Sequence, residues 1–96
     1  MAPPSPLIVK FVYQKTTQDI RRICVENPTL FKLRQLVSTL YGIEHFCLKY
    51  ADQDNELVTL KSEDDFNYAN FPTNNQPFRL YVTEGSHFII FDFFSY

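Results

Sequence analysis

The sequence predicts one α+β domain in which strands and helices follow one another in the order ββαββαβ. Three observations carry this prediction: strand-like alternation in five segments, an amphipathic helical stripe between the second and third of them, and a short capped helix before the last. The length of 96 residues suits one domain. A hydrophobic fraction of 45% is enough for a single core and argues against disorder.

Five segments are rich in β-branched and aromatic residues and alternate between apolar and polar positions. We expect strands at residues 7–13, 20–25, 46–50, 57–60 and 78–82, with the first two paired as a hairpin. Neighbouring side chains on a strand point to opposite faces of the sheet. The side chains expected to face the core are Leu7, Val9, Phe11 and Tyr13, then Phe46, Leu48 and Tyr50, and finally Phe78, Leu80 and Val82.

Two helices are expected, each with recognisable end signals. After a Thr29 N-cap, apolar residues recur at three- and four-residue steps from Leu30 to Leu40, and Gly42 follows where a left-handed C-cap belongs. Ser62 caps a second, shorter helix from Glu63 to about Asn70. Its first turn is acidic, which complements the helix dipole.

Two helices that cover one face of a mixed sheet, in this element order, form the ubiquitin-like β-grasp roll, and this is the fold we expect. We expect residues 1–6 to be a flexible, proline-rich lead-in, residues 7–83 to be the domain, and residues 84–96 to be an apolar tail of unknown role.

Opposite charges are concentrated in opposite halves of the chain. Through residue 49 there are seven Lys/Arg against three Asp/Glu, and from residue 50 there are two against eight. Six carboxylates lie within residues 52–65. Complementary charges on one small domain favour association with copies of itself or with relatives.

The residues that carry these charges resemble the Phox/Bem-one domain, a ubiquitin-like interaction module. Residues 50–66, with the pattern Tyr-x-Asp-x-Asp-x-Glu-x-Val-x-Leu-x-Ser-Glu-Asp-Asp-Phe, look like the acidic (OPCA) motif of that family. Lys10 is similar to its basic-strand lysine, so both halves of the type I/II pattern are present. Ile20-Arg21-Arg22 and Phe78-Arg79-Leu80-Tyr81 resemble segments of the N-terminal domain of sequestosome-type selective autophagy receptors. Asn55 replaces the glycine that is usual in the acidic turn.

The resemblance implies a scaffolding module that polymerises head to tail, or binds other Phox/Bem-one domains, in a selective autophagy receptor or a signalling scaffold. It places the basic interaction face at Lys10, Arg21 and Arg22. It places the acidic interaction face at Asp52, Asp54, Glu56, Glu63, Asp64 and Asp65. Strand phase alone leaves open which arginine joins Lys10, since neighbouring residues point to opposite faces.

Three alternatives remain from the residues themselves. One is a one-faced adaptor that uses only its acidic motif to bind a basic partner. Another is a purely structural domain whose carboxylates are a solvated face. The third is a calcium loop, because four of the carboxylates match EF-hand ligand spacing. However, the loop has Leu57 where the EF-hand requires glycine, and its flanks read as strands.

Other function classes find no support in the sequence. The two histidines, His45 and His87, have no recognisable nucleophile partner and no glycine-rich phosphate loop is present, so we expect no catalysis, no cofactor and no small-molecule substrate. Net charge −2 disfavours nucleic acid. Without a signal-peptide pattern or a long apolar run, we expect no membrane partner and a cytoplasmic location. Cys24 and Cys47 are expected to be buried free thiols.

Overall fold

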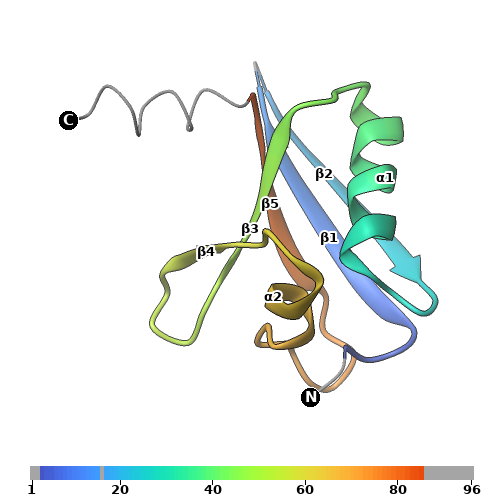
Figure 1. Ribbon diagram of the computed structural model, residues 1–96, viewed down its shortest axis with the longest axis vertical. Coiled ribbons are helices and arrows are strands. Elements are labelled where there is room, and N and C mark those ends of the chain that lie inside the picture. Colours follow the sequence, from blue (N-terminus) through green and yellow to red (C-terminus); the bar gives the residue numbers. More distant parts are fainter. Residues whose placement is uncertain (1–2, 16, 86–96) are drawn as a thin grey trace.

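The computed structural model of the protein describes residues 3–15 and 17–85, which form a five-stranded sheet and two helices (Figure 1). The predicted fold class, a ubiquitin-like β-grasp roll with the order ββαββαβ, is confirmed. The elements are β1 (Leu7–Gln14), β2 (Gln18–Val25), α1 (Leu30–Tyr41), β3 (Phe46–Ala51), β4 (Leu57–Thr59), α2 (Glu63–Asn67) and β5 (Phe78–Glu84).

The strands lie in the order β2-β1-β5-β3-β4, so the last strand of the chain is the central strand of the sheet. β1 and β5 run parallel, and the other neighbouring pairs run antiparallel, which makes the sheet mixed. β1 and β2 form the expected hairpin. β2 and β4 are the two edges of the sheet, and Figure 1 shows them on opposite sides of the molecule.

The core lies between one face of the sheet and the two helices. Leu33 and Val37 of α1 and Phe66 of α2 are fully buried in the same cluster as Phe11 and Leu80 of the sheet. All ten side chains that the alternation assigned to the core are buried there. The opposite face, here called the outer face, carries the side chains that alternate with these core residues.

The helix ends follow the predicted capping chemistry. The Thr29 hydroxyl accepts from the Lys32 backbone N–H, and Gly42 closes α1 in a left-handed conformation with φ of 66°. Ser62 caps α2, which ends at Asn67, three residues before the expected end. The reason is local, because the Tyr68 backbone leaves helical geometry and the Ala69 N–H donates to Phe66 in a tighter three-residue step.

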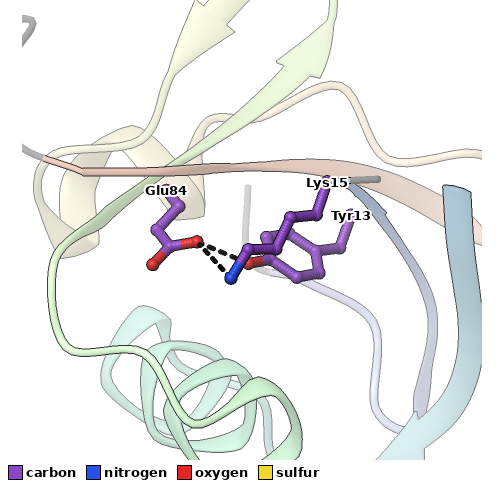
Figure 2. Close-up of polar contacts among 3 residues, drawn as sticks. All are labelled: Tyr13, Lys15 and Glu84. Atoms are coloured by element: carbon purple, nitrogen blue, oxygen red, sulfur yellow. Dashed lines mark hydrogen bonds and ion pairs between the residues drawn. The ribbon is translucent and has the colours of Figure 1, made fainter. Parts of the chain in front are cut away.

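One side-chain cluster links the ends of β1 and β5 (Figure 2). The Tyr13 hydroxyl donates a 2.6 Å hydrogen bond to Glu84 Oε1, and Lys15 Nζ lies 3.7 Å from the same oxygen. The hydrogen bond to this carboxylate, with desolvation as a second cause, raises the pKa of Tyr13 above its ordinary value. The cluster thus connects the first and last strands where their parallel pairing ends.

The structure also bears on the expectations for the two cysteines and for the ends of the chain. Cys47 is buried, but Cys24 is exposed, so the prediction for Cys24 was wrong. Cys24 pairs with Ile8 on the outer face of an edge strand, where no helix covers it. Within the proposed lead-in, the Ser5 hydroxyl accepts from the Asn27 backbone N–H at 2.8 Å. Residues 86–96, most of the predicted tail, lie outside the described residues.

Candidate interaction surfaces

The outer face carries a row of cations across three neighbouring strands. Lys10 on β1 pairs with Arg22 on the edge strand β2, and residues that pair in this way have side chains on the same face. On its other side, Lys10 pairs with Arg79 on β5. Lys10 is half-buried, whereas Arg22 and Arg79 are exposed. Within residues 3–15 and 17–85, none of the three forms an ion pair.

Arg79 was missing from the predicted basic face. Its outward phase was available from the sequence, since Phe78 and Leu80 were expected to face the core. The position of β5 beside β1 was not available, because a parallel pairing between the first and last strands is a tertiary feature. We therefore define the basic row as Arg22, Lys10 and Arg79.

Arg21 lies on the other face of β2. It pairs with Phe11, whose side chain is in the core, so Arg21 projects on the helix side. Its Nε lies 3.3 Å from Asp19 Oδ2, and its guanidinium lies 5.5 Å from the ring centroid of Tyr41. The structure thus brings Lys10 and Arg22 together and separates Arg21 from both. The role of Arg21 in binding stays a prediction.

The acidic turn between β3 and β4 is organised by Asp52. Its Oδ1 accepts hydrogen bonds of 2.9 Å from the backbone N–H groups of Asp54 and Glu56. Asn55 takes the left-handed conformation that the turn requires, with φ of 62°. As a result, Asp52, Asp54 and Glu56 each bring a carboxylate oxygen within 4.8 Å of the other two. Such a cluster concentrates negative charge at the β4 edge.

Two carboxylates around α2 hold backbone groups of the domain. Glu63 accepts from the first two N–H groups of α1, at Leu30 (2.8 Å) and Phe31 (3.0 Å). Asp65 Oδ2 accepts from the backbone N–H groups of Lys61 (2.8 Å) and Ser62 (3.0 Å), which completes a capping box. These two hydrogen bonds lower the pKa of Asp65. Both side chains were predicted to face a partner, and the structure gives each a bonded role inside the fold.

The remaining acidic side chains point to solvent without such a role. Asp54, Glu56 and Asp64 are exposed, and their carboxylates form no hydrogen bond or ion pair within the described part of the chain. We call these three residues the acidic surface. They lie on the β3–β4 turn and on α2, whereas the basic row begins at the opposite edge of the sheet.

Comparison with known proteins identifies the family of the domain. The family model of the PB1 domain, the Phox/Bem-one domain, matches residues 6–85. A protein from Zea mays named "HSP-interacting protein" is 32% identical over an alignment of 75 residues, and the alignment covers 73% of this chain and 10% of that protein. The chain therefore spans about a tenth of the length of that relative.

Two solved structures are similar in fold. The AtNBR1-PB1 domain matches with a TM-score of 0.59 and 17% identity, over 82% of this chain and 99% of that one. The same domain in a cryo-EM structure of the AtNBR1-PB1 filament (L-type) matches with a TM-score of 0.60 and 17% identity, over 81% and 98%.

The family match over residues 6–85 thus defines the class of the domain, a non-catalytic protein-interaction module. The chain belongs to the PB1 domain family, whose members bind other PB1 domains. Within residues 3–15 and 17–85, no helix is long and apolar enough to cross a membrane.

Proposed function

We propose that this domain assembles head to tail with copies of itself, Lys10 and Arg22 of one copy docking on the acidic surface of the next. The observation that carries the proposal is the strand order. β2, which holds Arg22, and β4, which follows the acidic turn, are the two opposite edges of one sheet. A contact between two different surfaces leaves one of each unoccupied at the ends of every dimer, so it continues into a ring or a filament.

The charges on both surfaces favour such a contact. The cations of the basic row lie beside one another without an internal counter-charge in the described residues, and the turn carboxylates are similarly crowded. In the proposed contact, Lys10 and Arg22 meet carboxylates of the next copy, and those carboxylates meet cations. Exposed apolar side chains accompany both surfaces, with Ile20 on the outer face beside Arg22 and Leu57 directly after Glu56.

The strength of the contact depends on several ion pairs acting together. One exposed ion pair contributes about 0–1 kcal/mol. Charge-assisted bonds that form a partly desolvated cluster are stronger, and arginine can bind a carboxylate through two parallel bonds. Charge screening acts over about 10 Å at 0.1 M salt, so we expect assembly to weaken as the salt concentration rises.

The wider context that we propose is the polymerising domain of a longer cytoplasmic protein, either a selective autophagy receptor or a signalling scaffold. The resemblance to sequestosome-type receptors and the fold likeness to the AtNBR1-PB1 filament support the first. In such a protein, polymerisation raises the avidity of the attached domains without new contacts.

The test separates the two surfaces onto two chains. The base-only chain carries Asp54→Ala and Asp64→Ala, and the acid-only chain carries Lys10→Ala and Arg22→Ala. Neither pair includes a side chain that bonds the backbone of its own domain. Sedimentation velocity is measured on the wild type, on each chain and on their equimolar mixture, across protein and salt concentration.

We expect salt-sensitive polymers from the wild type, monomers from each chain alone and a dimer from the mixture. A wild type that stays monomeric at all concentrations contradicts self-assembly and leaves a heterotypic adaptor, which a basic PB1 partner would reveal. Polymers that persist in both variant chains and at high salt contradict the proposed surfaces.

A further inference from the structure

We infer that Arg79 is a third binding cation of the basic row, and that its partner is a carboxylate of the acidic surface on the docking copy. The inference rests on the proposed head-to-tail contact and adds a residue from the last strand to it. It also widens the docking surface on the outer face, from β2 and β1 to the central strand β5.

The register of the sheet places Arg79 beside Lys10. Lys10 stands between Arg22 and Arg79, paired with one on the antiparallel side and with the other on the parallel side. All three side chains therefore project from the same face of neighbouring strands. Like charges directly opposite one another are destabilising in an isolated sheet. A docked anion that spans the row removes this repulsion from all three positions at once.

The surroundings of Arg79 leave its charge available to a partner. Its guanidinium lies 5.9 Å from the ring centroid of Tyr81, the next residue on the same face of β5. This contact keeps the charge over the sheet and leaves its hydrogen-bond donors available. Tyr81 in turn pairs with Lys49 on β3, so the outer face stays positive beyond β5. The described residues place no carboxylate against this guanidinium.

The row has a width that a cluster of carboxylates can match. Neighbouring strands lie about 4.8 Å apart, so three strands span roughly 10 Å from Arg22 to Arg79. The acidic surface offers Asp54 and Glu56, whose turn brings their oxygens within 4.8 Å of each other, and Asp64 on the following helix. A second copy therefore supplies three exposed carboxylates for the three cations of the row.

The experiment places Arg79→Ala in one chain of the dimer at a time. Calorimetric titration measures the affinity of the base-only chain for the acid-only chain, first with Arg79→Ala in the former and then with the same substitution in the latter. We expect about tenfold weaker binding when the base-only chain carries it, as for the loss of one charge-assisted bond. We expect an unchanged affinity when the acid-only chain carries it.

Two matched variants control for net charge and for the fold. Lys61→Ala in the base-only chain removes one positive charge beside the acidic side, which that chain no longer uses, and is expected to leave binding unchanged. Arg79→Lys is expected to recover part of the affinity, because the charge returns without the guanidinium fork. Amide spectra of each variant check that the sheet is intact.

Each result decides the matter. Weaker binding confined to Arg79→Ala in the base-only chain supports the inference. Unchanged binding, or a loss that follows Arg79→Ala into the acid-only chain or follows Lys61→Ala, overturns it while the head-to-tail contact stands. If the two parent chains form no dimer at all, the proposed function fails and the inference fails with it.

Discussion

Glu63 at the start of α2 accepts a 2.8 Å hydrogen bond from the backbone N–H of Leu30 at the start of α1. Its second carboxylate oxygen takes the next N–H, that of Phe31. The first turn of α1 contains no acidic residue of its own, so a carboxylate from the other helix neutralises the positive end of its dipole. A residue of the acidic motif thus stabilises the fold through hydrogen bonds to another helix, whereas the carboxylate of its neighbour Asp64 forms no hydrogen bond in the described part of the chain.

This difference predicts that substitution of Glu63 lowers the stability of the domain, whereas substitution of Asp64 weakens its association. Glu63→Ala is expected to lower the free energy of unfolding by about 1–2 kcal/mol, as for the loss of a helix cap. Asp64→Ala should change it by less than about 0.5 kcal/mol, yet weaken association. Both substitutions are made in the acid-only chain, so that assembly does not interfere. Urea unfolding measures the change in stability, and titration with the base-only chain measures the change in association. Equal losses of stability in the two variants would contradict the assignment.

The two arginines of β2 are expected to contribute unequally to binding. Arg22 lies in the basic row, whereas Arg21 projects on the helix side, beside Asp19 and Tyr41. In the base-only chain, Arg22→Ala should weaken binding to the acid-only chain about tenfold, and Arg21→Ala less than about threefold. Calorimetric titration measures the affinity of both variants. Each substitution removes one positive charge, so a difference between the two affinities reflects position and not net charge. A larger effect at Arg21 would mean that the acidic partner reaches around the edge of the sheet.

Asn55 gives a backbone prediction for the acidic turn. At φ of 62° a side chain with a Cβ is strained unless it tolerates the left-handed region, as Asn does better than most. Asn55→Ala should therefore cost about 1 kcal/mol of stability. Asn55→Gly should be neutral or slightly stabilising, since glycine enters this region without strain. Unfolding midpoints in the acid-only chain test both, and an Ala variant as stable as the Gly variant would exclude strain at this position.

Asp65 predicts a pH dependence of stability. Its pKa is lowered from 3.8, first by the hydrogen bond from the Lys61 backbone and then by that from Ser62. A lowered folded-state pKa contributes stability that is present above the unfolded value and is lost as the pH falls through the folded value. The difference in unfolding free energy between the acid-only chain and its Asp65→Asn variant should therefore narrow at low pH. A difference that stays constant from about pH 6 to pH 2 would disprove the charge contribution.

Local patterns were sufficient for most of the fold. The alternation around Lys10 placed Val9 and Phe11 in the core, and the spacing of Thr29 and Gly42 marked both ends of α1. These predictions succeeded because strand phase and helix capping depend on residues close together in the sequence. The start of α2 at Glu63 followed in the same way from Ser62.

The residues of the two surfaces could not all be predicted from local sequence, because some of them depend on which distant elements pack together. The neighbour of Lys10 on β5 depends on which strand lies in the middle of the sheet, so Arg79 was missed. Glu63 looked like any first-turn carboxylate, and only the packing of α2 near α1 shows that it reaches Leu30. The exposure of Cys24 likewise depends on β2 being an edge strand.

The central position of β5 has a consequence for how the domain is made. β1 has its parallel neighbour, and β3 its second partner, only when the chain has been synthesised through Glu84. Until then the β1–β2 hairpin and the β3–β4 hairpin are separate pieces without a common sheet, and neither can hold the helices over a complete core. Contacts between such distant segments form slowly. A nascent chain that stops before Phe78 would therefore carry all the carboxylates of its acidic surface, but without the five-stranded sheet that joins them to the basic strands.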